Sequence, residues 1–269
     1  MDENVVDLQL DRAHSARMYD YYLGGRTNFV ADREAVGKLM AVFPAVLVAA
    51  RANREFMHRS TRHLAAGGLR QFLDIGTGIP TRPNLHEIAQ QAAPESRIVY
   101  VDNDPIVLAH AQALLESHEA GRTAYVQADI TDPAAILSSP DLLDTLDLSR
   151  PIALSLNAVL HFVTDEHDPY GIVEKLKSAL APGSALALSH GTADFVPPHI
   201  SANGANVYRA AGTATQGRSR AEVARFFDGW DLIEPGIVTS HRWRPDEPAM
   251  LSDITDAESC AYVGVALKP

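Results

Sequence analysis

The sequence predicts an α/β fold with a mostly parallel sheet, helices on both of its faces and an antiparallel strand at one edge. Between about residues 70 and 190, short apolar runs alternate with segments whose apolar residues recur at helical spacing. Such alternation is typical of βαβ units, in which a helix follows each strand and crosses back over the sheet. The 269 residues, 46% of them hydrophobic, are enough to bury one large core.

The first 68 residues differ from this pattern because they contain no strand-like run. Helix-compatible patterns lie at about 11–23, 32–42 and 45–66, and no repeat or low-complexity linker follows them. We therefore expect residues 1–68 to form a helical extension, or cap, packed on a sheet domain of residues 69–269.

Five strands and four helices are expected in the alternating region. The strands are Gln71–Ile75, Arg97–Val101, Thr123–Ala128, Ile152–Leu156 and Ser184–Ser189, and the helices lie at about 84–93, 104–117, 133–138 and 169–180. Asp104 and Pro105 mark one helix start, since aspartate caps helices and proline suits the first turn. Pro182 and Gly183 end another helix and turn the chain into the next strand.

The C-terminal part is predicted to complete the sheet. Residues 192–218 hold glycine, asparagine, proline and threonine without a clear period, which is typical of a loop or lid-like insertion. Ser219 and Glu222 then form a capping box before a short apolar stripe. Two strands follow, Asp231–Val238 and Ala261–Lys268, and strands joined in this way should pair antiparallel and close one edge.

Composition excludes several function classes. The net charge of −11 argues against bulk nucleic acid or an anionic membrane as the partner. Cys260 is the only cysteine, so no intrachain disulfide or thiolate cluster can form. No apolar run reaches membrane-spanning length and the N-terminus is acidic, so a cytoplasmic location is the simplest. Residues 165–168 are rich in metal-ligand types, but consecutive residues cannot all face one ion, and we predict no metal.

The most informative motif lies at residues 72–78, where an apolar strand leads into Gly76-Thr77-Gly78. A strand followed by a G-x-G turn is the usual start of a dinucleotide site. Asp74, however, places a carboxylate at the strand end, which suits an amino group or a sulfonium better than a pyrophosphate. Thr81 also stands in the place of the third glycine of the dinucleotide fingerprint. The loop therefore favours S-adenosylmethionine (SAM) over NAD.

Further polar residues follow the next three strands, at the edge where such folds bind ligands. Asp102, with Asn103 beside it, can accept hydrogen bonds from ribose hydroxyls, or it can simply cap a helix. Asp129 can accept a bond from an adenine amine while Ile130 contacts the ring; the alternative is a turn residue.

The fourth strand ends at Asn157, which faces the methionine end of the ligand in such folds and could hold its amino group. His161 is a candidate base or substrate contact. A packed or solvated histidine without a role is the alternative.

The set formed by Asp74–Gly78, Asp102, Asp129-Ile130 and Asn157 resembles the class I, Rossmann-type SAM-dependent methyltransferases. The segment Arg17–Phe29, together with Ala31-Asp32-Arg33, resembles more specifically an actinobacterial family of predicted SAM-dependent methyltransferases, formerly a domain of unknown function. The likeness extends through Phe226–Trp230 and Glu234–Gly236, and so covers nearly the whole chain. It departs from the broader class at Ile79-Pro80-Thr81, which leaves open the path of this loop around the methionine carboxylate.

The resemblance implies transfer of a methyl group from SAM to an unidentified acceptor, with S-adenosylhomocysteine (SAH) as product. We expect a small-molecule acceptor, and the oligomeric state stays open. Two alternatives are a SAM-binding sensor or partner without transferase activity and an NAD-dependent oxidoreductase.

The N-terminal tyrosines suggest a cap over the methyl donor. Tyr19 and Tyr22 lie one helical turn apart, and aromatic faces attract cations such as a sulfonium. Tyr22 is also a candidate catalytic residue. Gly24-Gly25 would let the chain turn sharply, and Asn28 could then bind cofactor or substrate. Alternatively, the tyrosines only fix a helix to the sheet and the glycines end it.

Overall fold

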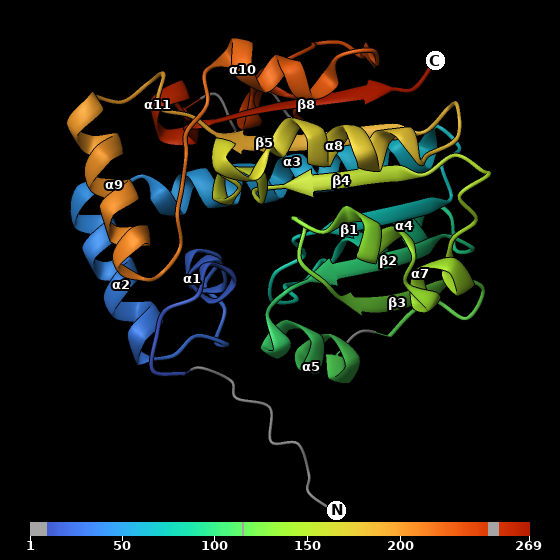
Figure 1. The fold of residues 1–269 in the computed structure, drawn as a ribbon, viewed down its shortest axis with the longest axis horizontal. Coiled ribbons are helices and arrows are strands. Elements are labelled where there is room, and N and C mark those ends of the chain that lie inside the picture. The colour runs from blue at the N-terminus through green and yellow to red at the C-terminus, as the bar shows by residue number, and fades with distance from the viewer. Residues whose placement is uncertain (1–9, 115, 247–252) are drawn as a thin grey trace, which may run out of the picture.

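A computed structural model describes residues 10–114, 116–246 and 253–269 of the chain. Its sheet has the strand order β3-β2-β1-β4-β5-β8-β6, and the short β7 also pairs with β8 (Figure 1). The strands are β1 Gln71–Ile75, β2 Arg97–Asp102, β3 Arg122–Gln127, β4 Ala153–Asn157, β5 Ala185–Gly191, β6 Asp231–Leu232, β7 Val238–Thr239 and β8 Ala261–Leu267. Strands β1 to β5 are parallel, and β8 runs antiparallel to β5, β6 and β7. The predicted α/β class, with a mostly parallel sheet and an antiparallel strand towards one edge, is confirmed.

The strand order reverses between β1 and β4, which are neighbours although two strands separate them in the chain. In open α/β sheets, the crevice for a ligand lies at the carboxyl ends of the strands at such a switch point. The motif at residues 72–78 follows β1 directly and therefore lies at this crevice.

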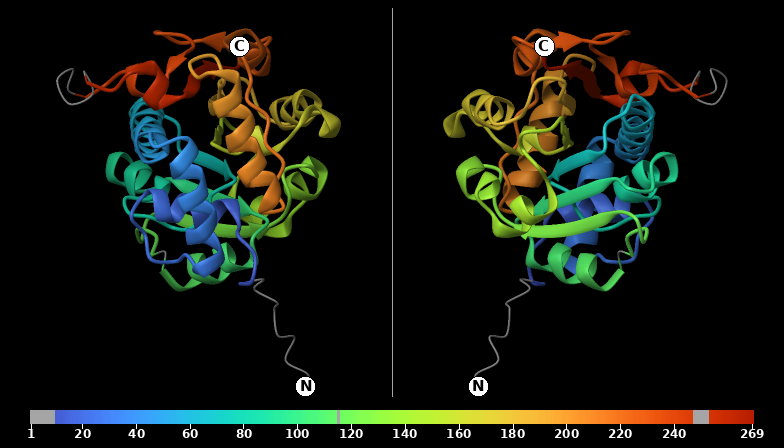
Figure 2. Two further views of the ribbon diagram at one scale, coloured as in Figure 1. Left: turned by 90° about the vertical axis from the view of Figure 1, so that its left-hand side faces the viewer. Right: turned by 90° about the vertical axis from the view of Figure 1, so that its right-hand side faces the viewer.

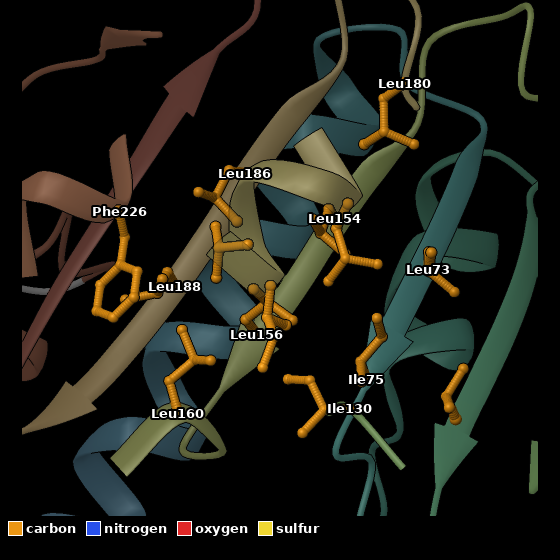
Figure 3. Close-up of a cluster of buried hydrophobic side chains, with 14 of the residues drawn as sticks. Leu73, Ile75, Ile130, Leu154, Leu156, Leu160, Leu180, Leu186, Leu188 and Phe226 are labelled. Carbon is orange, nitrogen blue, oxygen red and sulfur yellow. The ribbon is translucent and has the colours of Figure 1, made fainter. Parts of the chain in front are cut away.

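Alternation along the strands divides the core between the two faces of the sheet. Leu73 and Ile75 of β1 pack with Leu154 and Leu156 of β4 on one face, and Phe226 joins them (Figure 3). Helices α6 Pro133–Leu137, α7 Pro140–Thr145 and α8 Pro169–Ser178 contribute side chains to this cluster, as does Val223 of the short α10 Arg220–Ala224. On the opposite face Phe72 packs against α3 Val46–Ala66 and α4 Leu85–Ala92. Asp74 shares that second face with Phe72, and so points towards α3.

The N-terminal helices begin and end close to their predicted positions. They are α1 Ser15–Tyr22, α2 Val30–Val42 and α3. A separate apolar cluster joins α1, α2 and the first turns of α3 through Met18, Tyr22, Leu39 and Val46. The rest of α3 packs against β4, β5 and β8, so only its beginning belongs to this cluster.

The segment 192–218 is not an irregular loop, because it contains helix α9, Pro198–Ala210. Figures 1 and 2 show α9 alongside α2, at the side of the molecule that carries α1. The sequence of α9 includes Gly204, two asparagines and a serine, all weak helix formers. Val207 and Tyr208 pack on the α1–α2 cluster, and tertiary packing of this kind stabilises helices that intrinsic propensity does not.

The prediction of one continuous strand over Asp231–Val238 was also wrong, because two short strands lie at its ends. Its ends pair with β8 as β6 and β7, but Pro235 and Gly236 interrupt it, since proline has no N–H and Gly236 has a φ of +76°. The predicted capping box at Ser219 and Glu222 is confirmed at the start of α10. The remaining helices are α5 Pro105–Leu114, α10 Arg220–Ala224, α11 Asp256–Ser259 and the 3₁₀ turns Leu160–Phe162, Asp165–His167, Arg225–Phe227 and Ser240–Arg242.

Among the described helices, none alone is long and apolar enough to cross a membrane. Helices α2 and α3 would pass that test together, but the chain bends by 104° between them.

Candidate functional site

A cavity of about 870 Å³ lies at the carboxyl ends of β1, β2 and β4, bordered by α1, α3 and α9. Pockets for one small ligand usually measure about 300–1,000 Å³, so this cavity is large. Its wall contains every site residue predicted from the sequence except Asn28. These residues are Tyr19, Tyr22, Asp74, Gly76, Thr77, Gly78, Asp102, Asn103, Asp129, Ile130, Asn157 and His161.

A short chain of hydrogen bonds connects β1 and β4 at the centre of the cavity. Asn157 Nδ2 donates to Ser155 Oγ at 2.7 Å, and Ser155 Oγ donates to Asp74 Oδ1 at 2.6 Å. The register pairs Asp74 with Ser155, and alternation puts Asn157 on the same face. Burial raises the pKa of Asp74 to about 6, against the opposing effect of the Ser155 hydrogen bond. Asn157 Oδ1 is buried without a hydrogen-bond partner among the described residues, so this face of the cavity presents an unused acceptor atom.

Arg54 of α3 also lines the cavity, although no sequence motif indicates a role for it. Its guanidinium donates to the carbonyl oxygens of Thr81 and Pro83. This contact fixes the loop after Gly78 whose path the sequence left open. Its positive charge offsets part of the rise that burial causes in the pKa of Asp74, and its Nε is buried without a partner among the described residues. The pattern at residues 45–66 predicted a helix, but a predicted helix alone does not indicate which of its side chains faces the strand ends.

The G-x-G turn brings its two glycines into different surroundings. Gly76 has a φ of +77°, its N–H donates to Val101 O at 2.8 Å, and a Cβ there would lie 2.5 Å from Val159 Cγ2. Gly78 has a φ of +67°, but a Cβ there would meet nothing within 4 Å. Thr77 Oγ1 donates to Asp74 O at 3.1 Å and so closes the turn on β1.

Asp102 at the end of β2 holds the turn in place. Its Oδ2 accepts from Gly78 N at 2.8 Å and its Oδ1 from Asp104 N at 3.0 Å. Burial raises the pKa of Asp102. An ionised carboxylate oxygen can accept more than one hydrogen bond, so Asp102 retains acceptor capacity towards the cavity.

Asn103 and Asp129 are joined to each other across β2 and β3. Asn103 Nδ2 donates to Asp129 Oδ2 at 2.8 Å, and Asp129 Oδ1 accepts from both Thr131 N and Thr131 Oγ1. Burial raises the pKa of Asp129, but the bonds from Thr131 and Asn103 outweigh it, and the net shift is downwards. Asp129 thus makes the hydrogen bonds expected of a turn residue, and it also lines the cavity together with Ile130.

The two predicted tyrosines line the cavity and also fix α1 in place. Tyr19 OH donates to Ala50 O at 3.1 Å and accepts from Asn53 Nδ2 at 2.8 Å, both on α3. Tyr22 OH lies 3.1 Å from Tyr208 OH of α9. Burial raises the pKa of both Tyr19 and Tyr22, so their hydroxyls stay protonated at neutral pH.

Asn28 does not reach the cavity, contrary to expectation. Its Nδ2 donates to Asp20 Oδ2 at 2.9 Å and to Gly25 O at 3.1 Å, and its Oδ1 accepts from Arg33. The glycines serve this local structure. Gly24 ends α1 with a φ of +79°, and a Cβ on Gly25 would lie 1.9 Å from the Asp20 carboxylate.

His161 lies in the 3₁₀ turn after β4, with a second histidine behind it. Burial lowers the pKa of His161 to about 4 and the Arg218 charge adds to this effect, so the imidazole is neutral at physiological pH. Its ring meets His190 at 5.8 Å between centroids, and His190 Nε2 accepts from Arg218 Nη1 at 2.8 Å. Arg218 Nη2 in turn donates to Asp165 Oδ1 at 2.6 Å, so Asp165 serves an ion pair behind the cavity wall. Within the described residues, no three His, Cys, Asp or Glu side chains are grouped as a metal site.

Comparison with known proteins gives consistent matches. A family model described as S-adenosyl methyltransferase matches residues 1–269. A DUF574 family protein from Streptomyces avermitilis is 53% identical, with a TM-score of 0.94 over 98% of this chain and 100% of its own. A structure from Thermobifida fusca, named as a methyltransferase on a provisional basis, is 36% identical, with a TM-score of 0.88 over 97% of both chains.

A more distant match shares the fold alone. An O-methyltransferase family protein from Burkholderia thailandensis is 14% identical, with a TM-score of 0.53 over 83% of this chain and 59% of its own. No curated protein matches the sequence.

Proposed function

The chain belongs to the S-adenosyl methyltransferase family, and from this premise we propose which residues bind SAM and which surround the methyl acceptor. The protein is a SAM-dependent methyltransferase with a class I fold, and SAH is the product of its reaction. Membership of this family supports a methyltransferase rather than an NAD-dependent oxidoreductase or a SAM-binding protein without transferase activity. The acceptor and the residue roles are the subject of the proposal.

The observation that carries the proposal is the pairing of Asp74 with Asn157. A buried carboxylate of raised pKa and a buried amide oxygen, which has no partner in the described part of the chain, lie on one face, joined through Ser155. An unpaired buried acceptor is costly, and a bound ammonium group would satisfy the Asn157 oxygen while it pairs with the Asp74 carboxylate. We assign this pair to the amino group of SAM. Arg54, whose Nε likewise has no partner within the described ranges, is suited to the carboxylate of the same amino acid.

The remaining predicted residues divide along the ligand. Asp102 would accept from the ribose hydroxyls, since each of its oxygens has accepted only one backbone bond. Asn103, Asp129 and Ile130 would border the adenine. Tyr19 and Tyr22 line the far part of the cavity, where the acceptor would approach.

When bound, SAM supplies a methyl carbon activated by a positive sulfur, which an electron-rich atom of the acceptor can displace in line. The protein's task is then to orient the acceptor and exclude water. Asp74, Asn157 and Arg54 hold one end of the site, while α1 and α9 cover the other. Tyr22 is protonated and His161 is neutral, so we propose that both contact the acceptor. A protonated tyrosine cannot accept a proton, and we therefore do not propose Tyr22 as the base.

We propose a small-molecule acceptor, because the cavity is bordered by helices and the chain carries a net charge of −11. The segment 192–218 would act as the lid, since α9 and the residues after it form part of the wall. The cytoplasmic location remains a prediction.

Isothermal titration calorimetry tests the cofactor assignment directly. SAM and SAH should each bind the full chain, while NAD should not, because Asp74 lies where a pyrophosphate would need N–H donors. The Asn157→Ala variant should bind SAH about tenfold more weakly, corresponding to one lost hydrogen bond to a charged group. Binding of NAD without binding of either adenosyl ligand would contradict the proposal.

The affinity for SAH should rise with pH through about 6. In the free protein Asp74 has a pKa of about 6, and an ammonium partner favours the ionised form, so below that pH binding must first release a proton. We expect about tenfold weaker binding at about pH 5 than at about pH 7, since each pH unit below the pKa costs one factor of ten. Calorimetry in two buffers of different ionisation enthalpy measures the released proton.

Asp102 also has a raised pKa and would give a pH dependence of the same sign. The Asp74→Asn variant separates the two carboxylates. It should bind more weakly at neutral pH and lose most of the pH dependence; an unchanged pH profile would refute the role of Asp74.

A further inference from the structure

Among the described residues, the charged side chains of the cavity wall come from the strand ends, from α3, from α1 and from the segment that leads into α1. Asp74, Asp102, Asp129 and Arg54 surround the proposed SAM site, Arg12 precedes α1, and Arg17 of α1 lies 3.7 Å from Asp104 beside β2. The described wall residues from α2, from 196–217 and from 259–261 include no lysine, arginine, aspartate or glutamate. The cavity therefore has a charged half and an uncharged half.

The uncharged half is bordered by five rings, each in contact with the next, which we name the aromatic compartment: Tyr19, Tyr22, Tyr208, Phe162 and His161. The ring centroids of Tyr19 and Tyr22 are 6.3 Å apart, and the hydroxyls of Tyr22 and Tyr208 are 3.1 Å apart. Tyr208 meets Phe162 edge-on at 5.5 Å, and Phe162 meets His161 at 4.3 Å. All five rings line the cavity. They come from α1, α9 and the turn after β4, so the compartment joins the N-terminal helices to the core.

The titratable groups here stay neutral at physiological pH. Burial raises the pKa of Tyr208, as it does for the other two tyrosines, and it raises the pKa of the Cys260 thiol to about 11. Burial keeps His161 unprotonated, with Arg218 adding to the effect. Arg54 is the nearby charge that acts on Tyr19, and the proposed function assigns it to the carboxylate of SAM. A charged acceptor would therefore leave water without an ionic partner among the rings of this half, which is costly.

We propose that the aromatic compartment binds the methyl acceptor, and that this acceptor is an uncharged, flat aromatic or heteroaromatic compound. Aromatic pairs in edge-on or offset contact add about 0.5–1.5 kcal/mol each beyond the burial of their area, so several ring walls together select a flat ring. The inference rests on the proposed function, which assigns the charged half to SAM. It adds the chemical class of the second ligand.

Four probes of similar size test the charge and the flatness of the acceptor. They are 2-naphthol, which is neutral and flat; 6-hydroxy-2-naphthoate, an anion; 2-naphthylmethylammonium, a cation; and 2-decalol, neutral but saturated. Their affinities are measured by ligand-observed NMR on the full chain saturated with SAH. We expect 2-naphthol to bind at least about tenfold more tightly than each of the others, since one or two ring contacts supply that factor. Equal or tighter binding of any other probe, or no binding of 2-naphthol, overturns the inference.

Phe162→Leu tests the compartment itself, since it removes one ring and keeps an apolar side chain. It should weaken 2-naphthol binding about tenfold, which is the factor expected for one strong ring contact, and it should leave SAH affinity unchanged. The matched control is Phe195→Leu, because Phe195 packs against Tyr262 at 5.4 Å and does not line the cavity. An unchanged 2-naphthol affinity in Phe162→Leu overturns the inference.

The SAH titration separates this inference from the proposed function. If the unaltered chain fails to bind SAH, the assignment of the charged half is wrong. If SAH binds and 2-naphthol does not, only the assignment of the aromatic compartment is wrong.

Discussion

Replacing Asp102 by alanine is expected to weaken SAH binding about a hundredfold. The proposed role of this carboxylate is to accept from the ribose hydroxyls, and a hydrogen bond to a charged group is worth about 1.5–3 kcal/mol. The same substitution removes the acceptors for the N–H groups of Gly78 and Asp104, so the turn that carries the ligand also loses support. Calorimetry with SAH measures the affinity, and thermal unfolding monitored by circular dichroism measures how much of the fold remains.

Two other acids on the same side of the sheet provide controls. Asp129→Ala should weaken SAH binding about tenfold at most, because the Asp129 side chain is exposed and already accepts hydrogen bonds from Thr131 and Asn103. Asp132 caps α6 and does not line the cavity, so Asp132→Ala should leave SAH affinity unchanged. If Asp102→Ala bound SAH as well as Asp132→Ala does, the ribose assignment would be untenable.

Sequence reasoning located the ligand edge because parallel strands impose it. An apolar run in a parallel sheet must be buried, and the polar residue at its end must lie at the carboxyl edge of the sheet. Such runs end at Asp74, Asp102, Asp129 and Asn157. Ser155 could have been found in the same way, since it lies two residues before Asn157 and so shares its face. A serine within an apolar run gives no signal by itself, however, so the sequence pattern does not single out Ser155.

The contacts between distant segments could not be predicted in this way. Arg54 reaches the strand ends because α3 crosses the sheet, and helical periodicity does not contain that information. Tyr208 belongs to a helix whose own residues favour a loop, and its partner Tyr22 is 186 positions away. Asn28 has the side chain expected of a ligand contact, but its amide binds the buried carboxylate of Asp20 instead. Local patterns thus predict which face is polar, whereas long-range packing decides which side chains meet there.

Replacing Gly76 by alanine is expected to cost about 2–5 kcal/mol of unfolding free energy. A left-handed backbone costs an L-residue roughly 1–2 kcal/mol, and forcing an extra carbon into a packed region costs about 1–3 kcal/mol more. Both penalties apply, because φ is +77° and the new Cβ would lie 2.5 Å from Val159 Cγ2 and 2.6 Å from its Cβ. Val159 cannot simply rotate away, because its own Cβ is part of the clash. Urea unfolding followed by circular dichroism measures the loss.

Gly78→Ala separates the two penalties within the same turn. Its φ of +67° imposes the left-handed cost, but its Cβ meets nothing within 4 Å, so only about 1–2 kcal/mol should be lost. The difference between the two variants then measures how closely β1 and the segment after β4 approach at the switch point. Because that approach sets the distance between the G-x-G turn and Asn157, it also sets the width of the site on which the SAM assignment depends. Equal losses in the two variants would mean that Val159 yields, and that the site is wider than the contacts between these two segments indicate.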